Sequence, residues 1–134
     1  MRAFRWAVLV MMAVVGCASQ HKAEVRPLHA AAGTSAVVSQ QLEQGNQLFA
    51  QQDWAGAQQV YLATIQADQT LAEAHYNLAL TLERLGEKAE ARKPYVAAAN
   101  LAPGNKVIWD APPLRKYDRE LGLDRKSWMD ANPK

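Results

Sequence analysis

Apolar residues recur at steps of three and four positions along four stretches between residues 38 and 101. This spacing places them on one side of an α-helix and leaves the other side polar. The four stretches cover residues 38–51, 54–67, 71–85 and 88–101. The pattern therefore predicts four amphipathic helices joined by short loops.

The four predicted helices form two copies of one unit, because residues match at an offset of 34 positions. The matched pairs are Leu48 and Leu82, Ala55 and Ala89, Ala57 and Ala91, Tyr61 and Tyr95, and Ala63 and Ala97. Five matches that share one offset and fall at helical spacing indicate a tandem repeat.

The repeated unit resembles the tetratricopeptide repeat, a helix-turn-helix hairpin of the same length. The resemblance is carried by small and aromatic residues where the helices of a hairpin meet, and by a closing proline: Gly45, Ala57 and Tyr61 in the first copy, and Ala79, Ala91, Tyr95 and Pro103 in the second. The first copy departs from the pattern at Thr64 and Gln69. The resemblance implies an all-α fold, a short helical array with repeats at 38–71 and 72–105 within residues 38–105.

Several residues predict where the helices begin and end. Asp53 stands at an N-cap position, and the spacing of Thr70 and Glu73 is that of a capping box. Gly86 follows the third helix, where a left-handed residue is favoured. Pro94 lies inside the fourth predicted helix, so we expect either a late helix start near Glu90 or a kink.

The segment 106–134 is predicted to cap the array. Residues 105–109 begin a third copy of the unit, but Pro112 and Pro113 prevent its continuation. Two hairpins leave one apolar face uncovered, and arrays of this kind need a further unit or a cap. A short capping helix after Pro113 would meet this need. Trp128 and Met129 either fold back on the same face or form an exposed anchor for a partner.

The amino terminus has the pattern of a secretory signal peptide over residues 1–16. Arg2 and Arg5 precede an uninterrupted apolar run from Trp6 to Val15, which is too short to span a bilayer. The following Gly16 and Cys17 resemble a bacterial lipobox, which implies diacylglycerol attachment at Cys17. An ordinary secreted protein with an incidental cysteine is the alternative.

Residues 17–37 show no lasting period and are predicted to form a flexible, lipid-anchored tether. Ala18 follows the cysteine, and in Gram-negative lipoproteins this resembles a signal for the outer membrane. We therefore expect a protein held at the cell envelope, and at the outer membrane facing the periplasm if the source is Gram-negative.

The resemblance also implies a concave groove, lined by the first helix of each repeat, that holds an extended peptide or a helix. The residues expected to face it are Leu42, Asn46, Phe49, Tyr76, Leu80, Glu83 and Arg84. Some family members grip a terminal carboxylate with two asparagines and several basic residues. Asn46 and Asn77 match the asparagines, but Leu42, Val107 and Ala111 replace basic residues, so recognition of chaperone tails is not expected. Alternatively, the tether or the tail covers some of these apolar residues.

Composition excludes several function classes. The formal net charge of +2 includes Arg2 and Arg5, and the chain after residue 16 is balanced, so a nucleic-acid partner is not expected. One cysteine allows no internal disulfide. His21 and His29 lack the clustered ligands of a metal site, and His75 is interpreted as a half-buried packing residue. No catalytic constellation is recognised, so neither enzymatic activity nor a cofactor is expected.

Two function hypotheses follow. The first is a lipid-anchored adaptor that binds a protein partner in the bacterial envelope, for assembly, secretion or cell-wall work. The second is a structural lipoprotein that forms a homo-oligomer, its groove filled by a neighbouring copy.

Overall fold

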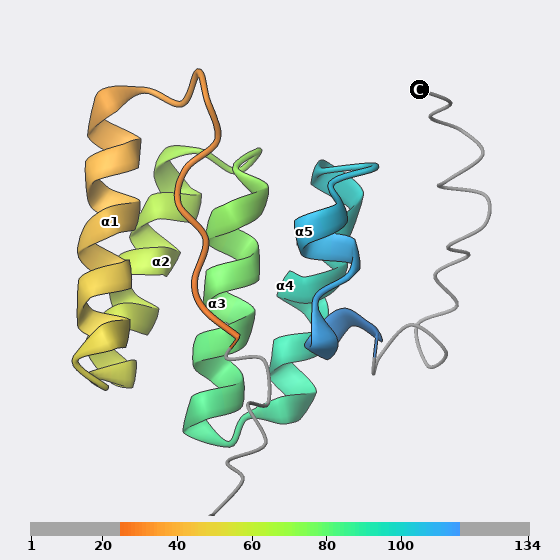
Figure 1. The fold of residues 1–134 in the computed structure, drawn as a ribbon. Helices are drawn as coiled ribbons and strands as arrows, with labels where there is room; N and C mark the ends of the chain where they lie inside the picture. Colours follow the sequence, from red (N-terminus) through yellow and green to blue (C-terminus); the bar gives the residue numbers. More distant parts are fainter. Residues whose placement is uncertain (1–24, 116–134) are drawn as a thin grey trace, which may run out of the picture.

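The computed structural model describes residues 25–115, and every regular element in that range is helical (Figure 1). The helices are α1 (Ala36–Ala50), α2 (Trp54–Ala67), α3 (Ala72–Leu85), α4 (Lys88–Leu101) and α5 (Lys106–Trp109). Residues 112–115 are helical again. The predicted all-α array is confirmed, and the bounds of α2 and α4 agree with those expected from the pattern.

The helices pair as two hairpins that stack on one another. α1 packs on α2, α3 packs on α4, and α2 also packs on α3, so a single core runs through both repeats. Tyr61 and Tyr95, which occupy the same position in the two copies, are both fully buried in this core. The repeated tyrosines thus fill equivalent places between the helices.

Gly45 lets α1 approach α2 closely. A Cβ atom at this position would lie 2.5 Å from Cε1 of the Tyr61 ring, far inside normal contact distance. Because glycine has no side chain, the ring can lie directly against the α1 backbone. This confirms the expectation that a small residue is needed where the two helices touch.

The helix ends agree with the expected caps at two places and differ at a third. The Asp53 carboxylate accepts from the Gly56 amide at 3.0 Å, and Gly86 is left-handed at φ 86°. The predicted capping box is wrong, because α3 begins one residue later, with Leu71 at its N-cap and no side-chain cap bond. The Thr70 hydroxyl and amide instead donate to the Asp68 carboxylate, at 2.7 and 2.9 Å.

Pro94 lies within α4, which begins at Lys88 rather than near Glu90. The late start is therefore wrong. Pro94 has no amide hydrogen and cannot donate to the carbonyl of Glu90, so the helix continues without that bond. Its side chain is buried, and burial compensates in part for the missing bond.

α5 and the residues after it pack on the second repeat. Ile108, Trp109 and Leu114 are buried, and the Trp109 indole donates to the carbonyl of Ala102 at 3.2 Å. This is the arrangement expected of a cap. Residues 116–134 of the predicted capping segment, including Trp128 and Met129, lie outside the described residues.

The structure differs from the expected tether over residues 25–35. Residues 25–32, here called the strap, cross in front of α3 between α1 and α5, and run opposite to α1 and α3 (Figure 1). Val25, Leu28 and Ala30 pack against the core. Residues 31–34 then turn into α1, with the Thr34 amide donating to Ala31 and Gly33 at φ 92°. The predicted signal peptide and lipid attachment at Cys17 fall on residues outside the described range.

Candidate binding groove

The candidate site is the concave face formed by α1 and α3, with α5 at its edge. The strap lies along this face (Figure 1). Its backbone is held at Leu28 by asparagines from both repeats. The groove expected to receive a partner's chain is therefore occupied by a segment of the same chain.

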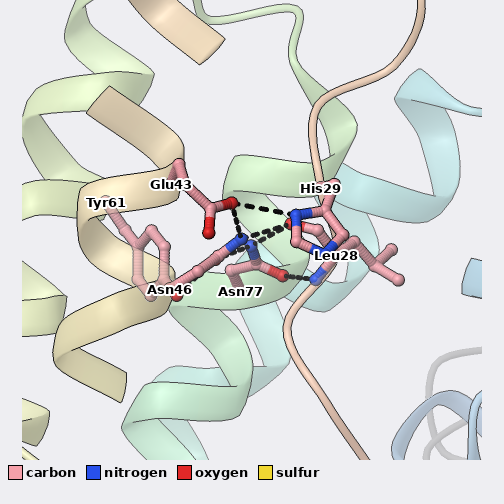
Figure 2. Close-up of polar contacts among 6 residues, drawn as sticks. All are labelled: Leu28, His29, Glu43, Asn46, Tyr61 and Asn77. Atoms are coloured by element: carbon pink, nitrogen blue, oxygen red, sulfur yellow. Dashed lines mark hydrogen bonds and ion pairs between the residues drawn. The ribbon is translucent and has the colours of Figure 1, made fainter. Parts of the chain in front are cut away.

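Asn77 contacts both backbone polar groups of Leu28. Its Oδ1 atom accepts from the Leu28 amide at 2.7 Å, and its Nδ2 group donates to the Leu28 carbonyl at 2.8 Å. Asn46 adds a second donor to the same carbonyl, with Nδ2 at 3.1 Å (Figure 2). The two asparagines thus bind the backbone of one extended residue, and these hydrogen bonds do not depend on its side chain.

A second layer of hydrogen bonds lies beneath this contact. The Tyr61 hydroxyl donates to Oδ1 of Asn46 at 2.8 Å, and Nδ2 of Asn77 donates to the same oxygen at 2.9 Å. Burial raises the pKa of the Tyr61 hydroxyl far above its ordinary value, and the nearby Glu43 raises it further. The hydroxyl therefore stays protonated and remains a donor across the physiological range.

The outer contacts of the strap are weaker. Nδ1 of His29 lies 2.9 Å from Oε2 of Glu43, but both side chains are largely exposed to solvent. Exposed pairs of this kind contribute little to stability. The three bonds to Leu28 are partly buried and attach the strap more specifically than this exposed pair does.

The residues expected to line the groove have different environments. Leu42, Phe49, Tyr76 and Leu80 are buried. Burial raises the pKa of Tyr76 to about 12, with Glu83 as a second cause. The partly buried carboxylate of Glu83 accepts from the Tyr95 hydroxyl at 3.1 Å, so it contributes to the interior of the second hairpin.

One part of the concave face stays open beside the strap. A pocket of about 640 Å³ is bordered by Phe49, Trp54 and Arg84, and by Arg26 and His29 of the strap. The two aromatic rings meet edge to face at 4.8 Å, and the Arg84 guanidinium carbon lies 5.8 Å from each ring centre. Cationic and aromatic groups at this distance attract one another. Trp54 was not among the groove residues expected from the sequence.

A smaller hollow lies on the other side of the strap. Its volume is about 280 Å³, and its walls include Leu28, Tyr76 and the α5 residue Val107. Val107 is largely exposed. The Leu28 side chain therefore faces a mainly apolar space between α3 and α5.

The side chain of His75 has a structural contact. His75 is half-buried, and its Nε2 atom lies 3.0 Å from the carbonyl of Gln69, which agrees with its interpretation as a packing residue.

Between residues 25 and 115, no group of three or more His, Cys, Asp or Glu side chains is placed to hold a metal ion. None of the helices in this range combines the length and apolar character needed to cross a bilayer.

Comparison with protein families identifies the repeat. Residues 45–86 match a family model described as a TPR repeat, and this range covers α1 from Gly45 onward, all of α2 and α3, and Gly86. The match confirms that this part of the chain is of the tetratricopeptide-repeat type. Comparison with curated proteins and with solved structures gives no match. Tetratricopeptide repeats in general mediate protein–protein interaction and typically serve as scaffolds rather than enzymes.

Proposed function

We propose that this chain is a lipid-anchored adaptor of the bacterial envelope, whose concave face binds an extended segment of a partner protein. The main support is the contact at Leu28, where Asn46 and Asn77 hold an extended backbone by three hydrogen bonds. A face that binds one extended segment has the donors and acceptors to bind another. The anchor is proposed at Cys17, on the sequence alone, with residence at the outer membrane facing the periplasm in a Gram-negative source.

Site-specific cross-linking in the native envelope tests the binding function. A photoreactive phenylalanine at Gln47, an exposed residue beside the open pocket, should cross-link a protein partner. The matched control places the same group at Gln59, which is exposed on α2 outside the groove. A partner specific to Gln47 supports the proposal. Identical products from both positions, or none from either, would contradict it.

The anchor is tested separately. Replacing Cys17 with serine should abolish acyl labelling and release the protein from the membrane fraction. Unchanged labelling and partitioning in that variant would refute lipidation. The alternative function is self-association through a neighbour's segment, and a strict monomer by analytical ultracentrifugation would exclude it.

A further inference from the structure

We propose that the strap is an intramolecular ligand that the partner's segment must displace, and that the partner therefore presents the same chemistry. That chemistry is an extended stretch with an apolar residue at the place of Leu28. This inference deepens the proposed function, because it takes the concave face as the partner site. It adds the chemical character of the partner's segment, and it identifies the strap as the segment that competes for the groove.

The strap is placed to be displaceable because the helices contact one another directly, even though Val25, Leu28 and Ala30 pack against the core. It has no regular hydrogen-bonded structure, and Leu28 itself is only half-buried. The turn that joins it to α1 contains one backbone bond, from the Thr34 amide to Ala31 at 3.2 Å. The hairpins pack on one another without it. Releasing the strap thus leaves the interfaces between helices in place.

The contacts also define the ligand. The groove presents two donors and one acceptor to a single residue, so it selects one carbonyl and one amide of an extended backbone. Proline at this place in a partner would lack the amide that Asn77 requires. Leu28 borders the hollow whose walls include Tyr76 and Val107, so an apolar side chain at its place in a partner would meet the same mainly apolar surroundings.

Competition within one chain has a measurable effect on affinity. A segment joined to its site by a short linker acts at an effective concentration in the millimolar range. If the strap fills the groove about 90 to 99% of the time, a competing peptide binds about 10- to 100-fold more weakly than it would to an open groove. A variant that releases the strap should therefore bind the competing peptide about 10- to 100-fold more tightly.

A pair of proline variants separates release of the strap from a general effect of proline. Leu28→Pro removes the amide that donates to Asn77 and leaves every groove residue unchanged. Ala32→Pro is the matched control, because Ala32 precedes the left-handed Gly33 in a turn closed between residues 31 and 34. Proline is favoured at that position of a type II turn. The control should therefore keep the strap in place.

The measurement uses a labelled peptide with the sequence of residues 24–33 and the chain from residue 17 onward carrying Cys17→Ser. Fluorescence anisotropy should show binding to Leu28→Pro about 10- to 100-fold tighter than to the parent or to Ala32→Pro. The same peptide with an N-methylated leucine should not bind. Equal affinities for parent and Leu28→Pro, binding that survives N-methylation, or no binding to a folded Leu28→Pro would overturn the proposal.

Hydrogen exchange on the parent protein provides a test that needs no variant. The Leu28 amide should exchange much faster than the core amides of α3, because the strap opens without global unfolding. Exchange as slow as that of α3 would overturn the proposal even if Leu28→Pro failed to fold. The peptide result is independent of any natural partner. If the peptide competes with the strap but cross-linking finds no envelope partner, only the adaptor function is refuted. If a partner binds while the strap stays in the groove, only this inference is refuted.

Discussion

Replacing Gly45 with alanine should destabilise the domain, although alanine is the better helix former. The new Cβ would lie 2.5 Å from Cε1 and 2.8 Å from Cδ1 of Tyr61. Tyr61 is fully buried, so its ring has no free space into which to move. Overpacking of this kind costs about 1 to 3 kcal/mol. Displacing the ring also weakens the hydroxyl bond to Asn46, worth about 1 kcal/mol.

Helix propensity acts in the opposite direction. Exchanging glycine for alanine inside a helix contributes about 1 kcal/mol in favour of folding. The net loss in the free energy of unfolding is therefore about 1 to 3 kcal/mol. For a domain of this size, a loss of about 2 kcal/mol lowers Tm by roughly 8 to 16 °C. Urea unfolding followed by circular dichroism measures the free energy, and a thermal scan measures Tm.

Two controls identify the cause of the change. Gln44 is exposed in the same turn of α1, so comparing Gln44→Gly with Gln44→Ala measures the helix-propensity effect alone. Adding Tyr61→Leu to Gly45→Ala removes the ring, and the double-mutant cycle should show favourable coupling. If Gly45→Ala instead stabilises the protein by the amount measured at Gln44, the close approach of α1 to Tyr61 does not limit packing and the reasoning is wrong.

Three further predictions concern single groups. Asp53→Ala should lower the free energy of unfolding by about 1 kcal/mol, because the Gly56 amide loses its acceptor; no change in urea unfolding would exclude the cap. Gly86→Ala should destabilise by more than about 1 kcal/mol, because alanine is strained at φ 86°, whereas an unchanged urea midpoint would mean that the helix end rearranges freely. Tyr76 has a pKa of about 12 in place of 10.0, chiefly through burial and then through Glu83, so its neutral form contributes stability that is present below pH 10 and lost as pH rises toward 12. The loss is at most about 3 kcal/mol, and Tyr76→Phe should remove this part of the alkaline destabilisation; identical pH profiles for the parent and Tyr76→Phe would contradict it.

The helical array was predictable because it is specified by the pattern of side chains along the sequence. The repeated small and aromatic positions fix the hairpins, and Gly45 indicates where they touch. The capping box failed because Asp68, two residues before Thr70, competes for the same hydroxyl. Local bonds between side chain and backbone often compete in this way with helix capping. Spacing alone does not show which acceptor a threonine will choose.

The strap was not predictable as a groove ligand, although cover by the tether was one of two open interpretations. Its attachment uses the amide and carbonyl of Leu28, groups that every residue except proline possesses. Backbone recognition leaves no periodicity in the sequence. The asparagines were recognised as candidate groove residues, but their target belongs to the same chain. The pocket at Trp54 was missed because that residue begins α2, a helix expected to lie behind the groove.

The hydrogen bond from Tyr61 to Asn46 has a consequence for selectivity. An asparagine side chain is nearly symmetric in shape, and rotation by half a turn exchanges its oxygen for its nitrogen. The tyrosine hydroxyl and Asn77 both direct hydrogens at one end of Asn46, so that end must be the oxygen. Tyr61→Phe would remove one of these two constraints and make the rotated state easier to reach. The loss of one hydroxyl group inside the hairpin would then alter which polar group Asn46 offers at the outer surface, with no substitution of any residue that a bound partner contacts.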